Sequence, residues 1–159
     1  MAIPTRSNHE FTNSEGSGPA WLFGYGSLIW KPAFPIDRSV SGFVRGWKRR
    51  FWQGSPDHRG TPRAPGRVVT LVEDSLAATW GIAVRIPPSD RTDVLRRLDH
   101  REQGGYERHV VTVEPDAGTP PIRALVYVAT PDNPHFVGPA PLDAMAWHVL
   151  RSRGPSGPN

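Results

Sequence analysis

Short apolar and β-branched runs that end in Gly, Pro, Asp or Ser recur along the chain and predict a protein built mainly of strands. Residues 43–52 alternate aromatic and basic side chains so that neither face is purely apolar, which predicts a strand with long amphipathic side chains on both faces. Glu73-Asp74-Ser75 predicts a turn between two β-branched runs. The predicted strands are residues 21–23, 43–52, 67–73, 79–86, 108–113 and 122–129.

Two stretches carry apolar residues at helical spacing. Pro87-Pro88-Ser89-Asp90 breaks a strand and caps a helix that ends before Gly104-Gly105. Its apolar stripe consists of Val94, Leu95 and Leu98. A second helix follows the proline-rich loop 131–141, and Pro141 is placed for its first turn. The predicted apolar face of this helix consists of Leu142, Met145, Ala146 and Val149.

The predicted elements are mostly strands, without regular βαβ alternation and without an internal repeat. This order predicts an α+β fold with a largely antiparallel or mixed sheet, compatible with closure as a β-barrel. Residues 1–18 are polar and predict a disordered or loosely docked N-terminal tail, followed by a single domain over residues 19–159. The loop at residues 54–66 is long for a structureless connection, and loops of that length are often functional.

Composition narrows the classes of chemistry. The 159 residues contain no cysteine, which excludes disulfides, thiolate nucleophiles and Cys-based zinc sites. No apolar run approaches the roughly 20 residues of a membrane helix, and residues 1–18 lack the pattern of a secretory signal, so we expect a soluble, cytoplasmic protein. The net charge of +4 rests mostly on arginine, which suits an anionic small substrate or nucleic acid equally. A GC-rich genome would also raise the arginine content.

Gly24-Tyr25-Gly26-Ser27-Leu28 follows the first predicted strand. Glycines let the backbone turn sharply there, and successive N–H groups can converge on one anion. The motif lacks the Gly-Lys-Ser/Thr ending of a P-loop, and Trp30 stands where a dinucleotide fingerprint would need glycine. Two interpretations stay open from these residues alone: a tight structural turn with Tyr25 packed inside, and an anion nest for a carboxylate.

The densest polar cluster, residues 99–106, lies where the first predicted helix ends and a strand begins. The negative end of a helix dipole raises the pKa of a carboxylate, and burial raises it further. A carboxylic acid tuned toward neutrality can act as general base and then as general acid. The alternative interpretation of the same cluster is a solvated helix end.

Other polar groups give weaker signals. Asp57-His58-Arg59 in the long loop is either a carboxylate-binding group or a polar loop tip. The six histidines show no metal-binding spacing, so we predict no metal site. Ser27 lacks the Gly-x-Ser-x-Gly context of a serine hydrolase. The basic and aromatic residues 45–52 predict either a nucleic-acid surface or a core strand whose cations reach solvent.

Eight motifs are spread over most of the chain. They are FGYGSLIWKP (23–32), RRFWQGS (49–55), DHRGTP (57–62), PGRVVTL (65–71), REQGGY (101–106), TPDNP (130–134), GPAP (138–141) and SRGPSG (152–157). Together they resemble the ChaC-like γ-glutamylcyclotransferases over about residues 21–157. The joint occurrence is far more specific than any one of the motifs.

The resemblance implies the γ-glutamylcyclotransferase-like barrel flanked by helices and a lyase that splits glutathione into 5-oxoproline and cysteinylglycine without a cofactor. It places the family's catalytic glutamate at Glu102, which we expect to act as general base and then acid. The family's substrate-binding turn falls on Tyr25, Gly26, Ser27 and Leu28. We add Tyr106 and Tyr127 as residues that line the pocket by hydrogen bonding. From position and charge we add Arg59 as a partner for the cysteinylglycine carboxylate.

Two alternatives accompany this interpretation. A catalytically inactive cyclotransferase-like module would bind nucleic acid through strand 45–52. An active enzyme could instead take another γ-glutamyl amine. The chain also departs from the family pattern after residue 157, where relatives continue with a stretch containing Glu-Tyr-Leu and this sequence stops at Asn159. We expect that departure to affect the packing of the last segment and none of the motifs assigned to chemistry.

Overall fold

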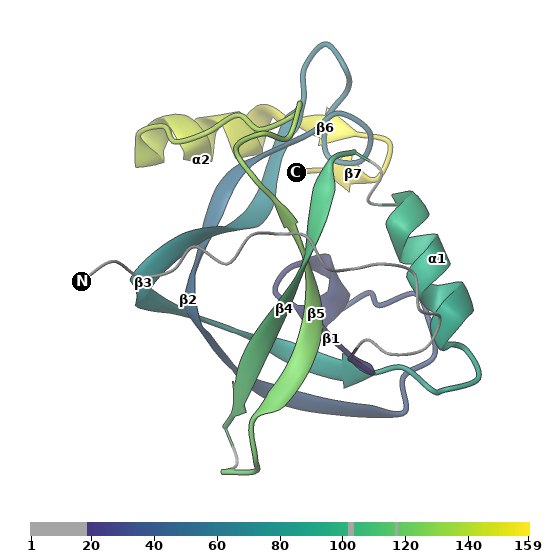
Figure 1. Ribbon diagram of the computed structural model, residues 1–159. Helices are drawn as coiled ribbons and strands as arrows, with labels where there is room; N and C mark the ends of the chain where they lie inside the picture. The colour runs from purple at the N-terminus through teal and green to yellow at the C-terminus, as the bar shows by residue number, and fades with distance from the viewer. Residues whose placement is uncertain (1–18, 102–103, 117) are drawn as a thin grey trace.

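A computed structural model describes residues 19–101, 104–116 and 118–159. Five strands close into a barrel in the order β1-β3-β2-β4-β5 (Figure 1). β1 (Trp21–Gly24) closes the barrel by pairing antiparallel with β3 and parallel with β5. The remaining pairs are antiparallel, so the sheet is mixed. The prediction of an α+β fold with a mixed barrel and flanking helices is confirmed. The predicted tail at residues 1–18 lies outside the described residues, and the single domain over residues 19–159 stays a prediction.

β2 (Arg38–Ser55) and β3 (Gly66–Arg85) form a long coiled ribbon, joined by the predicted loop. The predicted turn at Glu73-Asp74-Ser75 does not divide two strands, because β3 runs through it. Arg45 pairs with Ala78 and Trp47 pairs with Glu73, so residues 74–77 of β3 bulge opposite Gly46 alone. Such a bulge bends the ribbon and increases its twist, which lets two strands supply most of the barrel wall.

Two apolar clusters fill the fold on either side of the barrel wall. Inside the barrel, Phe23, Leu71, Val113 and Val126 are almost completely buried. The outer cluster includes Leu22, Val84, Leu125, Val94 and Leu98, the last two from α1 (Arg91–Arg101), so the helix covers one face of the barrel. Strand residues alternate between these clusters because successive side chains point to opposite faces. β4 (Tyr106–Pro115) and β5 (Ile122–Ala129) complete the wall, and β5 has the predicted bounds.

The C-terminal part lies across one end of the barrel (Figure 1). α2 (Leu142–Arg151) begins directly after Pro141, which is its N-cap residue rather than part of its first turn. None of its residues is buried, so the predicted apolar face does not join the core. A small hairpin of β6 (Arg153–Gly154) and β7 (Gly157–Pro158) follows. None of the helices within the described ranges is long and apolar enough to span a bilayer.

Candidate active site

The glycine turn, residues 24–28, leaves the barrel wall at the end of β1 and continues into a 3-10 helix, η1 (Ser27–Ile29). The carbonyl oxygens of Gly26 and Ser27 accept hydrogen bonds from the backbone N–H groups of Ile29 and Trp30, at 3.0 and 3.2 Å. The N–H groups of Gly26 and Leu28 donate no hydrogen bond to any residue that the structure describes. Two backbone donors of the predicted anion nest are therefore available to a ligand.

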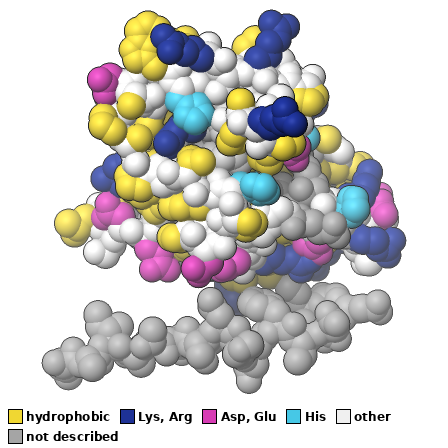
Figure 2. Space-filling view, turned by 90° about the horizontal axis from the view of Figure 1, so that it is seen from above, with side chains coloured by type: hydrophobic (Ala, Val, Ile, Leu, Met, Phe, Trp, Pro, Cys, Tyr) yellow, Lys and Arg dark blue, Asp and Glu magenta, His cyan; other side chains and the backbone are white. Residues whose placement is uncertain are grey.

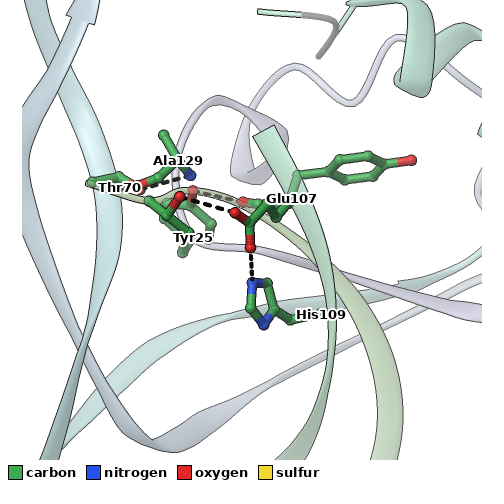
Figure 3. A network of polar contacts seen from close by, with 7 residues as sticks. Tyr25, Thr70, Glu107, His109 and Ala129 are labelled. Atoms are coloured by element: carbon green, nitrogen blue, oxygen red, sulfur yellow. Dashed lines mark hydrogen bonds and ion pairs between the residues drawn. The ribbon is translucent and has the colours of Figure 1, made fainter. Parts of the chain in front are cut away.

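Tyr25 fixes the turn to β5, the strand beside β1 in the barrel. Its side chain belongs to the inner apolar cluster and is only 9% exposed. Its hydroxyl donates a hydrogen bond of 2.8 Å to the carbonyl oxygen of Tyr127 on β5. Figure 3 shows Tyr25 beside Thr70, Ala129 and Glu107, where strands distant in sequence meet. The turn is thus held by packing and by a buried hydrogen bond.

Tyr106 and Tyr127 lie on the other side of the wall, in the outer cluster against α1. The Tyr127 hydroxyl donates a hydrogen bond of 2.6 Å to Oδ1 of Asp99 in α1, which also accepts a 2.7 Å hydrogen bond from Nε of Arg108. The backbone of Tyr127 therefore contacts the glycine turn while its side chain contacts the helix that precedes residue 102. Substrate contact by either tyrosine stays a prediction.

Glu102 lies outside the described residues, but the chain on both sides of it is anchored. On the N-terminal side, Asp99 is bound to Tyr127. On the C-terminal side, the carbonyl oxygen of Gly104 accepts a 2.7 Å hydrogen bond from Asn133, whose Oδ1 accepts a 3.0 Å bond from Gln53. Gln53 and Asn133 are 1% and 5% exposed, so this relay is shielded from water. These two residues come from the RRFWQGS and TPDNP motifs, whose structural role the sequence left unassigned.

The structure also places an acid and a base at the inner face that sequence reasoning missed (Figure 3). Glu107 and His109 pair across the sheet with Val128 and Val126 of the inner cluster, so their side chains share that face. Thr130 donates a 3.0 Å hydrogen bond to Glu107 Oε1. The Nε2 atom of His109 lies 3.4 Å from Oε2 of Glu107, within ion-pair range, but it makes no aligned hydrogen bond. Glu107, His109 and Val111 are each two positions apart, and this spacing was the signal in the sequence that they share one face of the strand.

Arg59 is held at a different part of the molecule. Its Nη1 atom donates hydrogen bonds to the carbonyl oxygens of Ser156 and Pro158, at 3.1 and 2.8 Å, and its backbone N–H donates to Ser55. These bonds attach the long loop to the β6–β7 hairpin. No hydrogen bond or ion pair joins Arg59 to the glycine turn within the described ranges, so its predicted contact with substrate stays a prediction.

A family model described as ChaC-like protein matches residues 20–159, which include the turn, its anchors and both flanks of Glu102. The chain belongs to the ChaC-like protein family. The resemblance inferred from the eight motifs is therefore confirmed.

Known proteins similar to this ChaC-like chain include cyclotransferases from animals and fungi. It is 49% identical over 154 residues to human glutathione-specific gamma-glutamylcyclotransferase 1, covering 94% of the chain and 69% of the relative. Identity to the rat protein of the same name is 50%, covering 87% of the chain and 64% of the relative. A crystal structure of a γ-glutamyl cyclotransferase specific to glutathione, from yeast, matches with a TM-score of 0.81 and 32% identity, over 89% of this chain and 82% of that one.

Strand 45–52 of the ChaC-like protein does not form one basic and aromatic surface. Trp47 packs against the inner cluster and its ring meets His109 edge-on at 5.3 Å, whereas Arg45 forms an exposed ion pair of 2.9 Å with Glu114. On the face seen in Figure 2, basic side chains are dispersed among hydrophobic and uncharged ones. This division between two faces matches the core-strand interpretation, and nothing favours the nucleic-acid alternative.

No group of three or more His, Asp or Glu residues suited to a metal occurs in the part of the chain that the structure describes.

Proposed function

We propose that this ChaC-like protein is a γ-glutamylcyclotransferase that converts glutathione to 5-oxoproline and cysteinylglycine. The observation that carries the proposal is the pair of anchors on either side of Glu102 together with a glycine turn that keeps backbone donors available. The similarity to proteins named glutathione-specific cyclotransferases supports glutathione over other γ-glutamyl amines.

The proposed reaction is an intramolecular aminolysis. The α-amino nitrogen of the γ-glutamyl group attacks the γ-carbonyl carbon and forms the ring C–N bond, and the bond to the cysteinyl nitrogen then breaks. Glu102 accepts the proton that leaves the attacking amine and passes a proton to the departing nitrogen. Atoms balance without water or an external nucleophile. The protein's main task is to hold the reactive folded conformer, because orientation lowers the barrier of a ring closure strongly.

The glycine turn has a defined role in this scheme. The N–H groups of Gly26 and Leu28, which donate to no described residue, would donate to a carboxylate of the substrate or to the oxyanion that develops on the γ-carbonyl. Tyr25 keeps the turn in place through Tyr127. Ser27 begins the 3-10 helix that orients these groups. We assign the turn to substrate binding, with Tyr106, Tyr127 and Arg59 as further binding residues.

The deciding experiment measures 5-oxoproline by mass spectrometry after incubation with glutathione. We expect wild-type protein to form product and Glu102→Gln to lose at least about 10²-fold in turnover while keeping its melting temperature, because positioned acid–base groups contribute about 10²–10⁴-fold. Glu114→Gln, at the Arg45 pair, is the matched control and should keep full activity. Absence of product from folded wild-type protein would refute the proposal.

Glu107→Gln separates the two acidic candidates for the role of base. Glu107 lies at the inner face with Tyr25 and His109, so it is the described carboxylate best placed to compete for the role of base. We expect this variant to retain most activity. Loss of turnover in Glu107→Gln, combined with an active Glu102→Gln variant, would transfer the acid–base role to Glu107.

We also propose the cytoplasm as the compartment, since glutathione is kept in its reduced form there. Fractionation of cells that express the tagged protein tests this assignment.

A further inference from the structure

Arg49 is a cation on the inner face of the barrel. It pairs directly across the sheet with Leu71, a residue of the inner cluster, and directly opposed residues of an antiparallel pair share a face. It also lies two positions after Trp47, which packs against that cluster. A basic side chain is thus turned into the barrel, while the adjacent Lys48 forms an ion pair of 3.4 Å with Asp74 on the outside.

The guanidinium group of Arg49 lies beside the beginning of the glycine turn. Its Nη2 atom donates a hydrogen bond to the carbonyl oxygen of Trp80. The next residue, Gly81, lies so close to the turn that a Cβ atom there would collide with the carbonyl oxygen of Gly24. Arg49 also interacts electrostatically with Tyr25, the central residue of the turn. The structure therefore places the Arg49 cation close to the start of the glycine turn and to Tyr25.

This charge has no anionic partner among the described residues. The other basic residues of the same stretch are satisfied: Arg45 by Glu114, Lys48 by Asp74, and Arg50 by the ring of Trp52 at 5.9 Å. The Nε atom of Arg49 is buried and makes no hydrogen bond. Burial lowers the pKa of the Arg49 guanidinium, because desolvation disfavours the charged form. Arg49 as a whole is half-buried, and a partly desolvated cation without a counter-ion is costly, so an anionic ligand would offset that cost.

We propose that Arg49 binds the α-carboxylate of the γ-glutamyl group, together with the N–H groups of Gly26 and Leu28. The inference rests on the proposed function and extends it to a named recognition residue. Both reacting atoms, the amine nitrogen and the γ-carbonyl carbon, belong to the γ-glutamyl half of the substrate, so that half must enter the enclosed side of the turn. Holding the carboxylate there orients the neighbouring amine toward the carbonyl. A guanidinium is suited to this contact because it can bind a carboxylate through two hydrogen bonds.

The test compares two substrates that differ only in the α-carboxylate. Glutathione carries it, whereas 4-aminobutanoyl-cysteinylglycine lacks it and can still cyclise, to 2-pyrrolidinone. We expect Arg49→Gln to lower kcat/KM for glutathione by about 10²-fold, since truncating one partner of a buried charge pair costs about 30-fold or more. For the analogue, kcat/KM of Arg49→Gln should stay within about threefold of wild type, because the analogue has no α-carboxylate for Arg49 to bind. Arg45→Gln, on the same strand but paired with Glu114, should leave both values unchanged.

The lysine variant distinguishes a loss of carboxylate binding from a folding defect. Arg49→Lys keeps the charge and should lower kcat/KM for glutathione by about tenfold, again without affecting the analogue. Equal losses on both substrates in the two Arg49 variants would overturn the assignment and leave only a structural role at Trp80. No product from either substrate with wild-type protein would instead refute the proposed function, and this inference would fall with it.

Discussion

Thr70 joins β3 to β5, two strands that share no backbone ladder in the closed barrel. Its hydroxyl accepts a 3.0 Å hydrogen bond from the N–H of Ala129 and donates one of 2.9 Å to the carbonyl oxygen of the same residue. Thr70 is completely buried, so water cannot replace these bonds (Figure 3). Thr70→Val keeps the shape of the side chain and removes only the hydroxyl. We expect it to weaken the barrel at this junction.

The size of the effect follows from the two bonds. Leaving the Ala129 N–H unsatisfied costs about 1–3 kcal/mol, and losing the bond to the carbonyl oxygen costs about 0.5–1.5 kcal/mol. We therefore expect Thr70→Val to lower the free energy of unfolding by about 2–4 kcal/mol. For a chain of this size, the melting temperature should fall by about 5–15 °C. Chemical denaturation and thermal melting, both followed by circular dichroism, measure the two quantities.

Thr79 provides the matched control. It is also buried and on β3, but its hydroxyl makes one hydrogen bond, of 2.8 Å, to the carbonyl oxygen of Trp47. Thr79→Val should therefore cost only about 0.5–1.5 kcal/mol. The reasoning is refuted when Thr70→Val lies within about 0.5 kcal/mol of wild type, or when the two variants lose the same stability.

Two further variants test the anchors of the site. Tyr25→Phe removes the buried bond to Tyr127, and we expect kcat/KM for glutathione to fall about tenfold, corresponding to a hydrogen bond of about 1–1.5 kcal/mol; unchanged steady-state kinetics would contradict a positioning role. Arg59→Met removes two bonds to the β6–β7 hairpin and should make that hairpin more susceptible to limited proteolysis than in wild type. A rise in KM for glutathione, absent for its C-terminal amide, would support the predicted contact of Arg59 with the glycine carboxylate, and equal KM values would dismiss it.

The sequence predicted the barrel elements well where local signals and pairing agree. The β-branched run at residues 122–129 became β5 with the same bounds, and the Gly104-Gly105 pair follows the end of α1. The turn predicted at Glu73-Asp74-Ser75 had a physical basis, since Asp74 Oδ1 accepts a 3.1 Å hydrogen bond from the N–H of Leu76. Pairing of β2 with β3 on both sides of this segment nevertheless made it a bulge. A local sequence pattern carries no information about that pairing between strands.

The second helix was misjudged for a related reason. Its apolar spacing predicts a buried face, but the barrel fills its own interior and leaves α2 on the surface, with Leu142 80% exposed. Arg49 was equally hard to assign from sequence, because an alternating strand does not tell which face is enclosed. That decision required its pairing with Leu71. The motif resemblance located the glycine turn but could not identify its anchors, which come from residues about a hundred positions away, such as Tyr127.

Closure of the barrel sets an order of events during folding. β1 meets β5 through the pairs Trp21–Ala124 and Leu22–Leu125, whereas β2 and β3 are consecutive strands joined by the loop at residues 56–65. Contacts between distant residues form late, because a long loop must be closed before they can form. The ribbon of β2 and β3, with β1 paired to β3, can therefore assemble while the chain is still being synthesised, but the barrel cannot close until β5 has left the ribosome. Since Tyr25 of the glycine turn is held by Tyr127 of β5, nascent chains that end before β5 should be unable to bind substrate.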